Sequence, residues 1–112
     1  MRNGIWAVAV LVALGATSCG DVCTRIGAAT DLLNRKGEGC GGQGKDSYDV
    51  AACERGLPKC SPDDVTELNS YAQCLENVPA CTSGQELSFG LAKVGCLQPL
   101  GRVSLSCLGA MQ

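Results

Sequence analysis

Nine cysteines and no histidine in a chain of 112 residues constrain this protein more than any other feature of its sequence. This cysteine content is typical of a small domain held together by disulfides, which persist in an oxidising compartment. The absence of histidine excludes Ser-His-Asp and Cys-His catalysis and removes a common zinc ligand. From Cys23 onward at least six residues separate neighbouring cysteines, so no C-x-x-C zinc motif is present. We therefore expect one exported, disulfide-bonded domain without a metal or a cofactor.

The first 18 residues have the pattern of a secretory signal peptide. Arg2 supplies a positive charge, residues 5–14 (IWAVAVLVAL) form an uninterrupted apolar run, and residues 15–18 are small. The apolar run covers ten residues, whereas a membrane-spanning helix needs roughly 20. The sequence therefore predicts a signal peptide over residues 1–18 and a mature cysteine-rich domain over residues 19–112.

Cys19 directly follows the predicted cleavage site. The segment Ala16-Thr17-Ser18-Cys19 resembles the lipobox of bacterial lipoproteins, in which the cysteine receives a diacylglyceryl group, although a lipobox usually has leucine in place of Ala16. Without Cys19 an even number of cysteines remains, and all of them can pair. They are Cys23, Cys40, Cys53, Cys60, Cys74, Cys81, Cys96 and Cys107. We predict lipidation of Cys19 and four disulfides; the alternative is a soluble secreted chain with one unpaired thiol.

The predicted mature chain is acidic. Without Arg2, eight Lys and Arg residues remain against eleven Asp and Glu residues, a net charge of −3. No cluster of basic residues could neutralise a run of phosphates, so the sequence argues against nucleic acid as a partner. An anionic membrane surface would not attract such a chain either, and membrane attachment would depend on the acyl chains at Cys19. No motif identifies a protein partner.

Two segments after Cys19 have the spacing and end signals of short helices. Residues 22–36 carry apolar side chains at i, i+4, i+7 and i+11, and their basic last turn suits the negative end of a helix dipole. Gly37 follows and can adopt the left-handed conformation of a C-terminal cap. A second helix is expected from a cap at Asp46 or Ser47 to about Arg55.

A third helix has the clearest start signal. Ser61 is a capping residue, and Pro62 occupies the first helical position, where no N–H is needed. Asp63 and Asp64 follow, and their carboxylates suit the positive end of the helix. An apolar stripe then continues to Leu75. These carboxylates therefore have a structural explanation and do not indicate a catalytic pair.

A fourth helix is expected to open with a capping box from Ser83 to Glu86 and to end before Pro99. Its predicted buried face carries Leu87, Leu91 and Val94. Residues 98–112 fit either a strand or a short helix, because periodicity alone cannot separate the two. The sequence predicts an all-α fold, a small disulfide-stapled bundle of about four short helices.

The pairing of the cysteines is left open, because eight cysteines allow 105 pairings. Residues 53–60 (CERGLPKC) and 74–81 (CLENVPAC) share the pattern C-x-x-x-[LV]-P-x-C and suggest that one type of corner occurs twice. Two pairings are favoured. Helices of matched length predict Cys60 with Cys96 and Cys74 with Cys81, whereas locally closed corners predict Cys53 with Cys60 and Cys74 with Cys81.

One stretch, GEGCGGQGKDS over residues 37–47, approximates a phosphate-binding loop. A working P-loop follows a buried strand and has a hydroxyl residue after its lysine. This stretch follows a predicted helix and has Asp46 in that position. We interpret it as a connector whose Cys40 is held in a disulfide. No catalytic residue is predicted, and the protein is not expected to be an enzyme.

The order of residues 53–96, from CERGLPKC to LAKVGC, resembles a group of small cysteine-rich lipoproteins from myxobacteria. The resemblance covers the mature chain and is closest at YAQCL (residues 71–75), at Pro79-Ala80-Cys81 and at Phe89. That group has no assigned activity. The resemblance therefore implies an exported, lipid-anchored, disulfide-bonded helical domain and no mechanism.

Three functions are compatible with these features. The leading hypothesis is an exported cell-envelope lipoprotein that acts as a structural or interaction module. The others are a secreted soluble effector or inhibitor-like domain and a small lipid-binding carrier. Secreted helical domains of this size with eight cysteines include the plant lipid-transfer proteins, but this chain lacks their Cys-Cys and Cys-x-Cys pairs. That likeness is therefore one of architecture.

Overall fold

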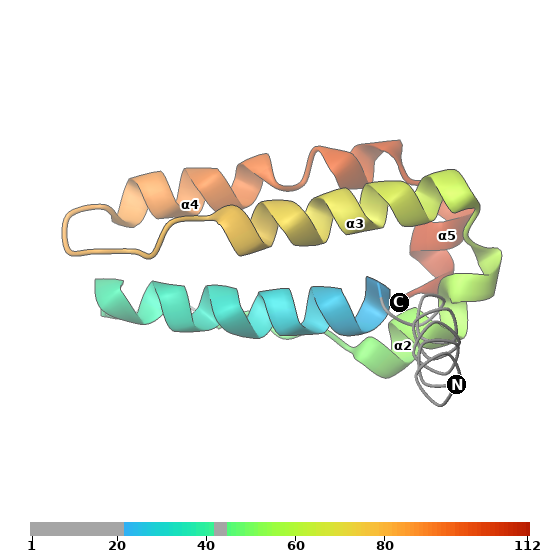
Figure 1. Cartoon of the computed structure of the whole chain (residues 1–112), viewed down its shortest axis with the longest axis horizontal. Coiled ribbons are helices and arrows are strands. Elements are labelled where there is room, and N and C mark those ends of the chain that lie inside the picture. Colours follow the sequence, from blue (N-terminus) through green and yellow to red (C-terminus); the bar gives the residue numbers. More distant parts are fainter. Residues whose placement is uncertain (1–21, 42–44) are drawn as a thin grey trace, which may run out of the picture.

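The computed structural model describes residues 22–41 and 45–112 (Figure 1). The predicted signal peptide, Cys19 and residues 42–44 of the glycine-rich stretch lie outside the described residues. The described part contains helices and no strand, as predicted. Its elements are a helix over residues 22–37, η1 (Glu38–Cys40), α2 (Val50–Gly56), η2 (Leu57–Lys59), α3 (Pro62–Asn77), α4 (Glu86–Gly95), η3 (Pro99–Arg102) and α5 (Leu105–Ala110).

Three long helices lie along the molecule. The helix over residues 22–37 and α3 run in the same direction, and α4 returns in the opposite direction beside α3 (Figure 1). The short helices α2 and α5 contact each other at the end where the first helix and α3 begin. We call this the α2/α5 end. At the opposite end, η1 meets the loop before α4 through the Cys40–Cys81 disulfide.

The core consists of two clusters that follow the first helix and α3. One cluster surrounds Ile26 and Leu68 at the α2/α5 end, and the other surrounds Leu33, Leu75 and Phe89 further along. The stripes predicted for these two helices are buried almost throughout. Aliphatic spacing at helical period is therefore sufficient to identify both buried faces.

The third predicted helix begins where its sequence signals place it. The Ser61 hydroxyl accepts from the backbone N–H of Asp64 at 3.1 Å, and the Asp64 carboxylate accepts from the N–H of Ser61 at 3.0 Å. This reciprocal arrangement is a capping box. The second helix begins later than predicted, because Asp49 and not Asp46 or Ser47 is the N-cap and accepts from the N–H of Ala52.

The expected left-handed cap at Gly37 is wrong. Gly37 is helical, with φ of −75° and ψ of −17°. The chain continues into the 3₁₀ turn of η1, and the left-handed residue is Gly41, with φ of 58°. This extension brings Gly39 against the backbone carbonyl of Cys81, so closely that a Cβ atom at Gly39 would collide with it. The glycine-rich stretch is therefore partly explained by close backbone packing.

The face predicted to be buried on the fourth helix is also wrong. Leu87, Leu91 and Val94 are 76%, 62% and 61% exposed, whereas Phe89 on another face is buried. The reason is that Phe89 and Cys96 pack in the core, and Cys96 is bonded to Cys74 of α3, which fixes the rotation of α4.

The predicted capping box that opens the fourth helix is absent from the described chain. The helix begins at Glu86 after Gln85, and the side chain of Glu86 accepts from the N–H of Gly84 instead. The ambiguous tail is helical: η3 is followed by α5, whose cap Ser104 accepts from the N–H of Cys107 at 3.3 Å.

All eight cysteines of the described chain form disulfides. The bonds join Cys23 to Cys53, Cys40 to Cys81, Cys60 to Cys107 and Cys74 to Cys96. Both predicted pairings are wrong. The two cysteines of each C-x-x-x-[LV]-P-x-C corner do not bond to each other, and Cys60 bonds to Cys107 and not to Cys96. Each bond spans between 22 and 47 residues. The disulfides therefore connect distant segments and do not close local turns.

The contact between α2 and α5 depends on the small size of Gly56. A Cβ atom at this position would collide with the backbone carbonyl of Ala110 and would lie 2.6 Å from the N atom of Met111. We expect Gly56→Ala to lower the free energy of unfolding by about 2 kcal/mol, because the backbone of α5 must shift. Urea unfolding followed by circular dichroism measures this.

Gly90→Ala is the matched control for that substitution. Gly90 lies inside α4, and no atom would lie within 4 Å of a Cβ there. Because alanine favours helix over glycine, we expect this variant to be more stable by up to about 1 kcal/mol. Equal effects of the two substitutions would contradict the close contact between α2 and α5.

Candidate functional site

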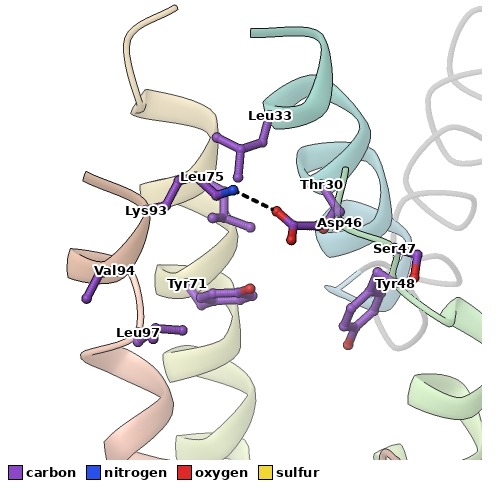
Figure 2. Close-up of a pocket in the computed structure, with 10 residues that line it drawn as sticks. All are labelled: Thr30, Leu33, Asp46, Ser47, Tyr48, Tyr71, Leu75, Lys93, Val94 and Leu97. Atoms are coloured by element: carbon purple, nitrogen blue, oxygen red, sulfur yellow. Dashed lines mark ion pairs between the residues drawn. The ribbon is translucent and has the colours of Figure 1, made fainter. Parts of the chain in front are cut away.

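A groove of about 340 Å³ lies between the first helix, α3 and α4 (Figure 2). Its apolar walls come from Leu33 and Leu75 on one side and from Val94 and Leu97 on the other. Two tyrosines line it further, so we call it the tyrosine groove. A concave, mostly apolar site with a few polar groups is the usual form of a small-molecule site in a protein.

Tyr71 of α3 and Tyr48 of the segment before α2 are both half-buried in this groove. Burial, and secondarily the proximity of Tyr71, raises the pKa of Tyr48 to about 12. Burial, followed by the charge of Asp46, also raises the pKa of Tyr71. Both hydroxyls therefore remain protonated at neutral pH and are able to donate hydrogen bonds.

An ion pair crosses the groove beside the tyrosines. Lys93 of α4 contacts the Asp46 carboxylate at 3.0 Å, and in Figure 2 this pair lies above the ring of Tyr71. Asp46 is held by Asn34, which accepts from its backbone N–H at 2.9 Å and donates to its carbonyl at 2.8 Å. Lys93 also lies 5.7 Å from the centre of the Phe89 ring. The ion pair thus holds the connector that contains Asp46 against α4.

A second cavity, of about 160 Å³, shares the two tyrosines with the groove. Ile26, Leu68 and Met111 contribute to its lining, and Tyr48 and Tyr71 line both cavities. The two mostly apolar spaces therefore adjoin each other at these tyrosines.

Asp64 is buried next to the Cys60–Cys107 disulfide, and its carboxylate could be mistaken for part of a metal site. The ligand atoms of these three residues lie within 4.8 Å of one another. However, the two sulfurs are bonded to each other, and the carboxylate accepts from the N–H of Ser61, the N–H of Ser104 and the hydroxyl of Ser104 at 2.8–3.0 Å. These bonds lower the pKa of Asp64 to about 2. The group is structural.

Basic side chains of the first helix hold the far end of α3. Lys36 donates to the backbone carbonyls of Glu76 and Val78, both at 2.6 Å. Arg25 forms two hydrogen bonds with the Glu76 carboxylate, which, with burial opposing them, hold the pKa of Glu76 below its usual value. The sequence predicted that Lys36 interacts with the negative C-terminal end of its own helix. Its ammonium group instead donates hydrogen bonds to carbonyls at the end of the neighbouring helix.

The glycine-rich stretch does not form a phosphate cradle in the part that is described. Glu38–Cys40 is a 3₁₀ turn, and residues 45–49 have no regular secondary structure, so no helix begins directly after Lys45 as a P-loop would require. Cys40 is bonded to Cys81, in agreement with its interpretation as a disulfide-held connector.

Sequence reasoning missed the tyrosine groove. Its residues come from the first helix, the connector, α3 and α4, and these segments share no local motif. One signal was available, because α4 carries large apolar residues on two faces, more than a single buried stripe requires. One of those faces supplies Val94 to the groove.

None of the described helices combines the length and hydropathy that crossing a membrane requires. Comparison with protein-family models, with curated proteins and with solved structures found no match for this chain.

Proposed function

We propose that the protein is an exported lipoprotein of the bacterial cell envelope that acts as an interaction module without catalytic activity. The four disulfides indicate a small oxidised domain that works outside the cytosol. The observation that carries the proposal is their pairing, because every cysteine of the described chain has a partner within it. The sequence contains nine cysteines, so Cys19 has no described cysteine left to bond and is available for acylation.

The position of Cys19 also suits an anchor. It precedes Val22, the first described residue, by three positions, and three residues of chain reach at most about 10 Å. An acyl group on Cys19 would therefore hold the α2/α5 end close to the membrane. The loop before α4 is at the other end of the long axis (Figure 1).

An interaction role is supported by the outer face of α4. Leu87, Leu91 and Val94 of α4, and Leu97 in the turn that follows it, are all more than half exposed. Single exposed apolar residues are common on soluble proteins, whereas a group of them on one helix favours a contact surface. The tyrosine groove adjoins this face, since Val94 and Leu97 belong to both.

The anchor is tested by mass spectrometry and fractionation of cells that express the full chain. We expect the N-terminal peptide to begin at Cys19 and to carry acyl mass, and Cys19→Ala to move the protein from the membrane to the soluble fraction. Two or more acyl chains make an anchor stable, and none of the described helices is long and apolar enough to replace it by crossing the membrane. Thr24→Ala, at an exposed position of the first helix, is the control and should stay in the membrane fraction.

A mature chain that begins elsewhere, or that has an unmodified Cys19, would overturn the anchor. That result would favour the secreted soluble effector, which predicts protein in the culture medium.

A further inference from the structure

Hydroxyl groups, one ammonium and one carboxylate are the polar side-chain groups that line the tyrosine groove. The hydroxyls of Tyr48 and Tyr71 make no hydrogen bond to any described residue. Lys93 adds an ammonium group, and Asp46 contributes the one carboxylate of the lining. Lys93 is the one cation of the lining, so an anionic group in a ligand can pair with it by taking the place of the Asp46 carboxylate.

The ion pair at the groove can exchange partners. The side chains of Lys93 and Asp46 are 26% and 52% exposed, and ion pairs of this exposure contribute little to stability. A ligand carboxylate can therefore replace that of Asp46 beside the Lys93 ammonium at small cost. Asp46 would remain held through its backbone by Asn34.

Apart from the polar groups, the lining of the groove is aliphatic, and part of it is exposed to solvent. Val94 and Leu97 are 61% and 52% exposed although they line it. A hydrocarbon chain lying along Leu33, Leu75 and these two residues would remove apolar surface from water, which is favourable. The second cavity, which shares the two tyrosines, extends the apolar region further.

We propose that the tyrosine groove binds an amphiphile with one hydrocarbon chain and an anionic head, of the long-chain fatty-acid class. The head lies beside the Lys93 ammonium, where the Asp46 carboxylate now contacts it, and the chain lies against the aliphatic walls (Figure 2). This inference does not depend on acylation of Cys19, because none of the residues involved belongs to the predicted anchor. A loss of anchoring and a loss of ligand binding are therefore separate outcomes.

A second copy of the chain is the competing occupant of this face. A stable protein interface buries about 800 Å² on each partner and includes about 20 residues or more. The exposed stripe offers three large apolar residues on α4 and Leu97 after it, which is small by that measure. Dimerisation through α4, seen by sedimentation of the ligand-free protein and abolished by Leu87→Glu, would overturn the proposal.

The test compares three probes with the same chain and different heads: dodecanoate, dodecanol and dodecyltrimethylammonium, each below its micelle concentration. The sequence contains two tyrosines, and both line the groove, so the NMR signals of labelled tyrosine rings report binding in the exported protein. We expect saturable shifts of both signals with dodecanoate, at an affinity about tenfold above that of the cationic probe. No saturable shift, or equal affinity for the cationic probe, would overturn the proposal.

Two pairs of variants locate the head and the chain. Lys93→Met should weaken dodecanoate about tenfold and leave dodecanol unchanged, because it removes a charge that only the carboxylate uses. Lys59→Met, at an exposed position of η2 away from the groove, is its control and should change neither.

Val94→Glu should abolish binding, since it puts a carboxylate in the groove wall, whereas Leu87→Glu should not. Both residues are exposed on α4, but only Val94 lines the groove, so both variants should fold. Equal losses in the two variants would show adhesion to the whole face of α4 and would overturn a site in the groove.

Discussion

The double substitution Cys23→Ala and Cys53→Ala is expected to lower the free energy of unfolding by about 4 kcal/mol. The bond closes a ring of 30 residues between the first helix and α2, and chain entropy alone predicts a loss of this size. Both cysteines are completely buried in the cluster around Ile26 and Leu68. Because small domains have about 5–15 kcal/mol of stability in total, this variant should be close to unfolding at physiological temperature.

The pair Cys40→Ala and Cys81→Ala is the comparison. Its ring is longer, 41 residues, so chain entropy predicts an almost equal loss of about 4 kcal/mol. Cys40 is only partly buried, however, and a greater loss for Cys23 and Cys53 would measure the packing of their sulfurs in the core. Urea unfolding of both variants measures this. A loss below about 2 kcal/mol at Cys23 and Cys53 would contradict their place in the framework.

Asp64→Asn is expected to lower the melting temperature by about 10 °C. The carboxylate accepts from two backbone N–H groups and a hydroxyl at the starts of α3 and α5. Asparagine has the same shape but one acceptor oxygen, so its amide group would face a buried N–H of Ser61 or Ser104. Asp63→Asn makes the same change of charge at an exposed neighbouring position and should change the melting temperature by a few degrees at most.

The pH dependence of this difference identifies the carboxylate as its cause. Asp64 has a pKa of about 2 in the folded protein, against an ordinary value of 3.8. A lowered pKa contributes stability that is fully present above pH of about 4 and is lost as the pH falls towards 2. The melting temperatures of wild type and Asp64→Asn should therefore converge between pH of about 4 and 2. A constant difference over that range would show that the substitution acts through shape alone.

The helices that could be predicted are those whose signals are local. The first helix and α3 each have one apolar stripe, and Ser61 and Asp64 form a capping box within four residues of sequence. The rotation of α4 could not be predicted in this way, because its leucines and Phe89 occupy different faces. Which face of α4 is buried depends on the disulfide between Cys96 and Cys74, which is a long-range contact.

The disulfide pairing and the groove depend even more on tertiary structure. The repeated corner suggested local closure, but Cys53 is buried against the first helix, whereas Cys60 reaches α5. Likewise Asp46 and Lys93 meet because Asn34 holds the connector across the first helix. No property of a short window of sequence specifies contacts between such distant segments, so composition could indicate disulfides but not their partners.

The order of the four disulfides along the chain has a consequence for exposure to proteases. The spans 23–53, 40–81 and 60–107 overlap in succession. Any single break in the backbone between Cys23 and Cys107 therefore lies inside at least one bridged span, and both fragments stay covalently joined. An extracellular protease that cuts one exposed loop would nick this domain without dividing it, and the cut chain would separate only after reduction.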